Sequence, residues 1–446
     1  MKKYKIGIIG YNEKLERSFF QTPILEDLKS RFDVDILTTY DSPSRIKVTR
    51  IESYFTQYEI KLFALLTNLC WITYRKHSSS FIFRFKRMYL SDFNWIQKTD
   101  KGSVDMFFLI KRILYTLKII FKTKSTFWFL VPYKKKLLFI LSKLTPQNSK
   151  ILSVLGQYDF IIIHSSGVDK YTSIICNALS KSKTLSLIVA ENWDNLTSKQ
   201  VMLFKPNFVT SIGDIDFENI KRIHGFTDSQ VLSIGLPKLY FLNNVNRNIT
   251  RNEDNFKIYY VGFYLPHDEI NLLNNLLAEI SKSGINATIY YRPHPKQAVR
   301  YSSQILDKRI VKVSHSINDS TGLMDLNEAY KDDLLNADLV IGPPTTLILE
   351  AMISKCPVLI DLTDDFIHRT TARKAASEYL HIKDFVKIFK DLTFYEISEL
   401  IPMIQQLVDQ NSRVINYKDL SKVVTPDTFM YGLRLSEFIE AKLKSN

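Results

Sequence analysis

Short apolar runs alternate with amphipathic stretches along most of the chain. In the first half, six runs have the length and apolar content of buried strands, at 3–10, 33–39, 158–166, 184–192, 208–213 and 231–235. Between them, stretches such as 23–32 and 170–182 repeat apolar residues at helical spacing. The alternation predicts an α/β chain with parallel sheets.

The same alternation restarts after 245–255, a polar, turn-rich stretch that predicts a linker. Five further strands are expected at 256–263, 287–293, 310–315, 337–343 and 356–362. Helices are expected at 268–284 and 345–355. We therefore predict two Rossmann-like domains, 1–245 and 253–425, with a closing helix at 426–446. Such sheets bind ligands at the carboxyl ends of their strands, and we expect the two domains to face a cleft there.

Length and composition agree with two globular domains. The chain has 446 residues, of which 45% are hydrophobic and 13% aromatic, so extensive disorder is excluded. The three cysteines, Cys70, Cys176 and Cys356, are far apart, which disfavours a disulfide framework or a metal knuckle and suits a reducing cytosol. The apolar core of the N-terminus is too short for a signal peptide, and no charge-free apolar run predicts a spanning helix.

The net charge of +14 is concentrated in one segment. Residues 101–150 contain eleven Lys and Arg and one acid, Asp105, mixed with aromatic and aliphatic residues. With its flanks (about 50–150), this segment predicts a helical insertion in the first domain that holds the protein at the inner face of the cytoplasmic membrane. A basic helical subdomain packed on its own protein is the alternative. No motif for nucleic acid accompanies the charge.

The first chemical motif ends the strand expected at 287–293. Arg292-Pro293-His294-Pro295 cannot continue into a helix, because a residue before proline is held extended. The His294 imidazole is therefore expected at the carboxyl end of the strand. There it can donate to a phosphate oxygen, with Arg292 or Lys296 adding charge. A capped turn with a surface histidine is the alternative.

The second motif joins a buried strand to a helix. Gly342-Pro343-Pro344 leads into Thr345 and Thr346, with Thr345 as the expected N-cap. Hydroxyls and N–H groups at a helix start form an anion site, and Glu350 lies near enough to meet a ribose hydroxyl. An ordinary capped helix is the alternative. Neither a Walker sequence nor GxGxxG after a strand occurs, which disfavours ATP-driven and nicotinamide chemistry.

The third motif follows the strand expected at 184–192. Many polar side chains crowd around one tryptophan, which is costly unless they face a cleft: Glu191, Asn192, Trp193, Asp194, Asn195, Thr197, Ser198 and Lys199. Asp194, or Glu191 as second choice, is the expected general base. Trp193, Asn195, Ser198 and Lys199 are expected to bind the acceptor. A polar loop with Trp193 as a lid over the core is the alternative.

A weaker motif, His164-Ser165-Ser166 with Asp169, follows the strand expected at 158–166. A hydrolase would need a GxSxG elbow, which is absent, so we expect His164 to line the acceptor site. Gly10 and Gly262, at the ends of their strands, are placed in the acceptor and donor sites respectively. The eight histidines are scattered and predict no metal site.

The order of these motifs resembles bacterial GT-B glycosyltransferases of surface polysaccharides: sialyltransferases, polysialyltransferases, Kdo transferases and CDP-glycerol glycerophosphotransferases. The resemblance spans roughly 155–365. It implies that His294-Pro295 contacts the donor nucleotide and that Thr345-Thr346 grips its phosphate. Trp193-Asp194-Asn195 stands where the glycerophosphotransferases have Trp-His-Gly.

With this resemblance we expect an inverting transferase. It needs no metal, because histidine, arginine and the helix dipole can take its place, and no cofactor, because the nucleotide-sugar is its substrate. Its acceptor would be a glycan or glycolipid, and its location cytoplasmic and peripheral at the inner membrane. Two rivals stay open. One is a nucleotide-sugar 2-epimerase of the same fold, and the other is an inactive scaffold of a polysaccharide assembly complex.

Neutralising Lys134, Lys135 and Lys136 with glutamine is expected to release the protein from vesicles that contain phosphatidylglycerol. Each cation near an anionic surface contributes about 1 kcal/mol, so affinity should fall roughly 100-fold. Co-sedimentation measures it, with phosphatidylcholine vesicles as the control. Equal binding of variant and wild type would favour the packed subdomain.

Overall fold

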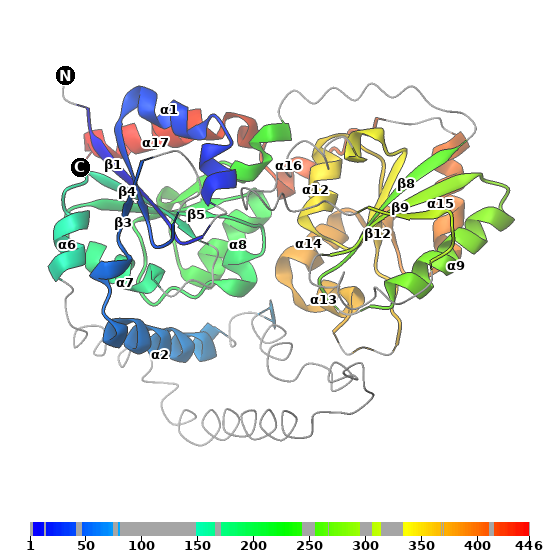
Figure 1. Cartoon of the computed structure of the whole chain (residues 1–446), viewed down its shortest axis with the longest axis horizontal. Coiled ribbons are helices and arrows are strands. Elements are labelled where there is room, and N and C mark those ends of the chain that lie inside the picture. Colours follow the sequence, from blue (N-terminus) through cyan, green and yellow to red (C-terminus); the bar gives the residue numbers. More distant parts are fainter. Residues whose placement is uncertain are drawn as a thin grey trace, which may run out of the picture. The chain divides into compact units, whose positions relative to one another are not determined.

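The computed structural model describes most of the chain outside the basic segment. The described residues are 3–12, 15–41, 47–74, 79–80, 149–165, 171–242, 255–265, 267–294, 306–313, 333–366, 368, 370–409 and 414–445. They form two compact units, one made of residues 1–240 with 421–446 and the other of residues 241–420 (Figure 1). Residues 245–254 of the predicted linker and residues 101–148 of the basic segment lie outside the described residues.

The N-terminal unit contains a seven-stranded parallel sheet with the order β3-β2-β1-β4-β5-β6-β7. Its strands are β1 (Lys5–Gly10), β2 (Asp33–Thr38), β3 (Val48–Arg50), β4 (Phe160–Ser165), β5 (Leu185–Ala190), β6 (Phe208–Ser211) and β7 (Val231–Ser233). The central strands read as continuous apolar runs because both of their faces are buried, as in other doubly wound sheets.

Helices cover both faces of this sheet, and a separate apolar core fills each layer (Figure 1). One core contains side chains of α1 (Ile24–Arg31) and of the C-terminal helix α17 (Tyr431–Ser445). The other contains side chains of α2 (Gln57–Tyr74), α6 (Ser149–Leu155), α7 (Thr172–Leu179) and α8 (Asp214–His224). In the sequence, α2 lies within the first part of the predicted insertion at about 50–150.

The chain returns to the N-terminal unit at its end. The buried Thr428 hydroxyl donates to the Leu236 carbonyl at 3.1 Å and accepts the Leu236 N–H at 3.2 Å. Downstream, Tyr431 is fully buried, and Arg31 of α1 forms an ion pair with Glu440 of α17 at 3.4 Å. The closing helix is thus part of the N-terminal core.

The C-terminal unit contains a six-stranded parallel sheet with the order β10-β9-β8-β11-β12-β13. Its strands are β8 (Phe256–Val261), β9 (Ala287–Arg292), β10 (Ile310–Lys312), β11 (Leu339–Gly342), β12 (Val358–Asp361) and β13 (Thr393–Phe394). The amphipathic helices α9 (Glu269–Lys282) and α15 (Ile397–Asp409) share one core with the sheet. The other helices of this unit include α12 (Thr346–Ile353), α13 (Ala372–Glu378) and α14 (Leu380–Ile388).

Both sheets are wound outwards from their middle. In each, the chain runs from a central strand to one edge and then returns to the other side of that strand, so the direction reverses between β1 and β4 and between β8 and β11. Doubly wound sheets bind ligands at the carboxyl ends of the two strands that flank this reversal. The predicted α/β architecture of two Rossmann-like units is confirmed.

No helix among the described residues combines the length and apolar character needed to cross a membrane.

Candidate functional site

Next to the reversal point of the C-terminal sheet, the ends of β8 and β9 approach each other too closely for any side chain on Gly262. A Cβ built on Gly262 would lie 2.9 Å from the His294 backbone nitrogen, 3.0 Å from the Arg292 carbonyl oxygen and 2.7 Å from Glu269 Oε2. The Gly262 N–H donates to the Arg292 carbonyl at 2.8 Å. Glycine is therefore required here for space, and it brings the His294 backbone against the end of β8.

A second glycine has the same role on the other side of β8. A Cβ on Gly342, at the end of β11, would lie 2.6 Å from the Val261 carbonyl oxygen. Gly342 leads through buried prolines to Thr345, which is in the N-cap position of α12 as predicted. The Thr345 hydroxyl makes no capping hydrogen bond and is buried without a hydrogen-bond partner among the described residues. It is thus a polar group at the helix start that no described residue satisfies.

His294 and Thr345 consequently flank β8 on its two sides, at the same edge of one sheet. Two strand spacings, about 10 Å, separate the strands that carry them. The His294 ring packs edge-on against Tyr264, with ring centroids 5.5 Å apart. Glu350, predicted to meet a ribose, is buried in α12. Pro295 and Lys296 lie outside the described residues.

Arg292, at the end of β9, interacts electrostatically with the buried Tyr259 hydroxyl of β8. Burial raises the pKa of the Tyr259 hydroxyl, and the charge of Arg292 acts on the same hydroxyl in the opposite sense. Asp333 is a third member of this group, since its charge also acts on Tyr259. Arg292 therefore has protein partners on the β8 side of its strand.

Glu269, the first residue of α9, holds the ends of β8 and β9 together. It is fully buried, and its carboxylate accepts the Phe263 N–H and the Tyr291 hydroxyl, both at 2.6 Å. Burial raises the pKa of Glu269 to about 7, although both hydrogen bonds act to lower it. Across β11, the Tyr260 hydroxyl of β8 donates to Asp361 of β12 at 2.7 Å. A buried polar layer thus supports the edge that carries His294.

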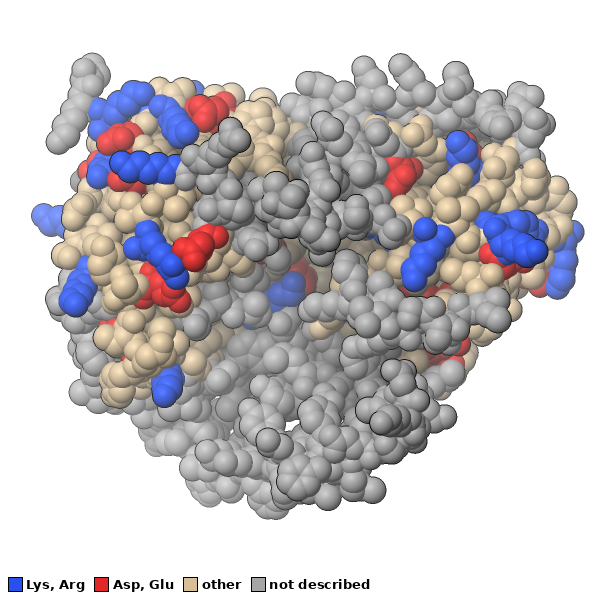
Figure 2. Space-filling view, in the orientation of Figure 1, with Lys and Arg blue, Asp and Glu red and all other residues tan. Residues whose placement is uncertain are grey.

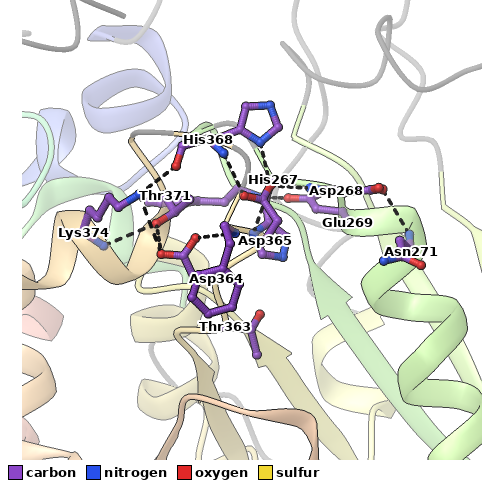
Figure 3. A network of polar contacts seen from close by, with 12 residues as sticks. His267, Asp268, Glu269, Asn271, Thr363, Asp364, Asp365, His368, Thr371 and Lys374 are labelled. Carbon is purple, nitrogen blue, oxygen red and sulfur yellow. Dashed lines mark hydrogen bonds and ion pairs between the residues drawn. The ribbon is translucent and has the colours of Figure 1, made fainter. Parts of the chain in front are cut away.

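A polar network connects the loop after β8 with the loop after β12 (Figure 3). Asp365 is at its centre: its carboxylate lies 2.6 Å from His368 Nδ1 and accepts the Asp268 N–H at 3.2 Å. Burial acts to raise the pKa of Asp365, but the hydrogen bonds and charge of His368 outweigh it and hold the pKa well below its usual range.

In the N-terminal unit, Gly10 and His164 are register partners on the two strands that flank the reversal point. His164 is buried, with Nε2 3.1 Å from the Ser18 hydroxyl and Phe19 edge-on to its ring. The neighbouring Asn195 is also buried and donates to the Ser165 carbonyl at 2.9 Å. The structure therefore brings Gly10, His164 and Asn195 to one edge of this sheet.

Asp194 and Lys199 form an ion pair at the same edge. The ammonium nitrogen lies 2.7 Å from each carboxylate oxygen, and the two side chains are 23% and 25% exposed. Trp193 and Ser198 are buried, and the Ser198 hydroxyl donates to the Asp194 carbonyl. Of the predicted base and acceptor contacts in this loop, Asp194 and Lys199 thus reach furthest towards solvent. Roles for Trp193, Asn195 and Ser198 at an acceptor stay predictions.

Two further residues hold this loop. Glu191, the second choice for a base, is buried and accepts a hydrogen bond from Asn192 at 2.9 Å. His224, in the last turn of α8, has Nε2 2.7 Å from the Leu196 carbonyl oxygen, to which the neutral ring donates. Burial lowers the pKa of His224 to about 4, so the ring is neutral at pH 7. The loop therefore rests on α8.

The described surface carries no broad field of one sign on the face shown in Figure 2, where cationic and anionic side chains are interspersed. Among the described residues, Arg50 and Asp41 form an exposed ion pair at 2.7 Å. No group of three or more His, Cys, Asp or Glu side chains among the described residues is arranged to hold a metal ion.

Comparison with known proteins identifies the architecture. A protein from Listeria monocytogenes assigned as a UDP-N-acetylglucosamine 2-epimerase matches with a TM-score of 0.54 at 12% identity, over 100% of this chain and 98% of the other. The S. aureus MnaA–UDP complex matches with a TM-score of 0.51 at 11% identity, over 100% and 97%. The chain has the GT-B fold.

At such low identities the likeness establishes a shared fold and no shared activity. Glycosyltransferases are also among the structural neighbours, at lower scores. The wall teichoic acid polymerase TagF matches with a TM-score of 0.40 at 9% identity, over 100% of this chain and 90% of the other. No protein-family model matches the chain, and no curated protein matches its sequence.

Replacing Glu269 with glutamine is expected to flatten the pH dependence of stability. A carboxyl group whose pKa is raised from 4.5 to about 7 on folding stabilises fully below pH 4.5 and loses this effect as the pH rises through 7. The loss is on the order of 3 kcal/mol and is absent in a side chain that cannot ionise. Urea unfolding followed by far-UV circular dichroism at pH 5 and pH 8 measures it.

Glu279→Gln is the matched control, because Glu279 lies in the same helix with its side chain 42% exposed. It should keep the pH dependence of the wild type. An unchanged difference between pH 5 and pH 8 in Glu269→Gln would show that Glu269 is ionised in both states.

Proposed function

We propose that the protein is an inverting glycosyltransferase that moves a sugar from a nucleotide-sugar donor onto a lipid-linked or growing surface glycan. The observation that carries the proposal is the reversal point of the C-terminal sheet. There two glycines without room for a Cβ lie between the His294 strand end and the buried Thr345 hydroxyl. Within the GT-B fold, the motifs favour the bacterial group that builds capsules and related surface polysaccharides.

The C-terminal unit would bind the donor nucleotide. Its phosphate would accept hydrogen bonds from the His294 imidazole and from the hydroxyls and N–H groups of Thr345 and Thr346 at the start of α12. Because Arg292 has partners on the Tyr259 side, we assign the direct contact to His294 and the helix start. These groups are fixed before the reaction, so they stabilise the charge that develops on the leaving phosphate without reorganisation.

Asp194 of the N-terminal unit would act as the general base. It removes the proton of an acceptor hydroxyl while that oxygen attacks the anomeric carbon from the side opposite the phosphate. The bond between this carbon and the phosphate oxygen breaks, and its electron pair stays on the phosphate. The Lys199 ammonium lies 2.7 Å from this carboxylate and would have to release it for the carboxylate to accept the proton.

The acceptor would be presented at a membrane surface. The basic aromatic segment at 101–150 would bind anionic lipid on the inner face of the cytoplasmic membrane and bring the enzyme to a lipid-linked glycan. The basic and aromatic composition of this segment supports anionic lipid as a partner.

A nucleotide-sugar 2-epimerase is the second candidate, favoured by the structural neighbours with TM-scores above 0.5. An epimerase changes the sugar of its donor without an acceptor. Incubation of the protein with UDP-N-acetylglucosamine alone separates the two activities, because only an epimerase releases a 2-epimerised product.

Asp194→Asn is expected to abolish transfer while leaving nucleotide binding intact, since general-base catalysis typically contributes 10²–10⁴-fold. His294→Ala should weaken binding of the nucleotide about tenfold, because one charge-assisted hydrogen bond is lost. Thermal shift with CMP, CDP, UDP, GDP and dTDP identifies the nucleotide. Calorimetry and a sugar-transfer assay then measure both variants.

Lys308→Gln is the matched control. It removes a cation from the exposed turn before β10, on the side of the sheet where the strands begin rather than end. It should behave as the wild type. Full transfer by Asp194→Asn would place the base elsewhere. If none of the five nucleotides binds or is turned over, the transferase is wrong and the inactive scaffold is supported.

A further inference from the structure

The network in Figure 3 contains an imidazole–carboxylate–imidazole group that none of the predicted motifs includes. Asp365 Oδ2 lies 2.6 Å from His368 Nδ1 and 4.0 Å from His267 Nδ1. The Asp365 side chain is 7% exposed, and those of His267 and His368 are 10% and 16% exposed. Two histidines from different loops thus face one almost fully buried carboxylate oxygen.

This group spans the carboxyl end of β11. Asp268 and His267 follow β8, whereas Asp365 and His368 follow β12, and these two strands flank β11 in the sheet. The hydrogen bond from the Asp268 N–H to Asp365 therefore crosses the end of β11, where the chain turns into α12. His368 consequently lies at the same edge as the Thr345 hydroxyl.

The loop after β12 is held in place by bonds that do not involve the imidazole of His368. The His368 N–H donates to Asp365 at 3.0 Å, and Lys374 donates to the His368 carbonyl at 2.8 Å. Asp364 accepts the Phe366 N–H at 2.9 Å and the Thr371 hydroxyl at 3.2 Å. If the only role of the His368 imidazole were to hold this loop in place, it would add little stability, because these other bonds already hold the loop.

The contact with Asp365 instead orients the ring. An ionised carboxylate at Nδ1 fixes the tautomer with Nδ1–H towards the carboxylate and favours the protonated imidazole. In the protonated ring Nε2 also carries a proton, and it can then donate to an anionic oxygen. Among the described residues, the charged groups near the ring include Asp365, His267 and Asp268. Asp364 and Lys374, which lie 3.9 Å apart, belong to the same network.

We propose that His368 binds a phosphate oxygen of the donor nucleotide through Nε2, with Asp365 as its positioning residue. The inference rests on the proposed function, because it takes the α12 start as the nucleotide site. It adds a second imidazole donor to the phosphate site, on the side of β11 away from His294. The ligand class is a nucleoside mono- or diphosphate.

Two substitutions of His368 separate ligand binding from a structural role. In His368→Asn the amide nitrogen takes the place of Nδ1, so the bond to Asp365 is kept and the group at Nε2 is lost. In His368→Gln the longer side chain reaches the Nε2 position and gives up the bond to Asp365. The affinities of CMP, CDP, UDP, GDP and dTDP are measured by calorimetry on the full chain, alongside the corresponding nucleosides.

The proposal predicts that His368→Asn binds the preferred nucleotide about tenfold more weakly than the wild type. Its nucleoside affinity and its Tm should stay unchanged, and His368→Gln should lie closer to the wild type in nucleotide affinity. A purely structural role of His368 predicts the reverse order: a lowered Tm in His368→Gln and normal nucleotide binding by His368→Asn. That result would overturn the proposal.

The outcomes also distinguish this inference from the function on which it rests. If the wild type binds a nucleotide and His368→Asn binds it equally well, the role of His368 is wrong and the donor site stands. If the wild type binds none of the five nucleotides, both are wrong.

Discussion

The close approach of three strand ends in the C-terminal sheet is the constraint on which the proposed chemistry depends. β9, β8 and β11 meet where Gly262 and Gly342 leave no room for a Cβ. Any side chain at either position would push apart the His294 and Thr345 segments. Because neither glycine has a left-handed backbone, spacing rather than conformational freedom selects them. The proposed function requires this spacing, because one nucleotide would have to reach both segments.

A buried polar layer keeps this edge rigid. Glu269 binds the ends of β8 and β9, and the Tyr260–Asp361 hydrogen bond ties β8 to β12 across β11. Buried polar groups of this kind are costly unless fully hydrogen-bonded, and each of these has a partner at 2.7 Å or less. The N-terminal unit presents a different surface at its corresponding edge, where Asp194 and Lys199 are partly exposed. The proposed function assigns nucleotide binding to the first of these edges and proton removal to the second.

Periodicity predicted the strands of both sheets well, because doubly wound strands are buried on both faces and read as apolar runs. It missed β3 and β13, whose three and two residues are too short for a pattern. His294 and Thr345 were predicted as site residues because proline and glycine mark the strand ends next to them; their roles stay predictions. Glu269 and His368 were missed, since each looks like an ordinary helix or loop residue. Glu269 bonds to Tyr291 on another strand, and the His368–Asp365 pair is joined to the loop after β8 through the Asp268 N–H, so no local pattern encodes these contacts.

The position of a bound phosphate tests this account most directly. A crystal of the chain soaked with the nucleotide that most raises its Tm, carrying a thiophosphate, locates the group through the anomalous signal of sulfur. We predict the thiophosphate at the carboxyl ends of β8 and β11, within hydrogen-bonding distance of Thr345 or the first N–H groups of α12. A thiophosphate bound at any other part of the chain would contradict the account.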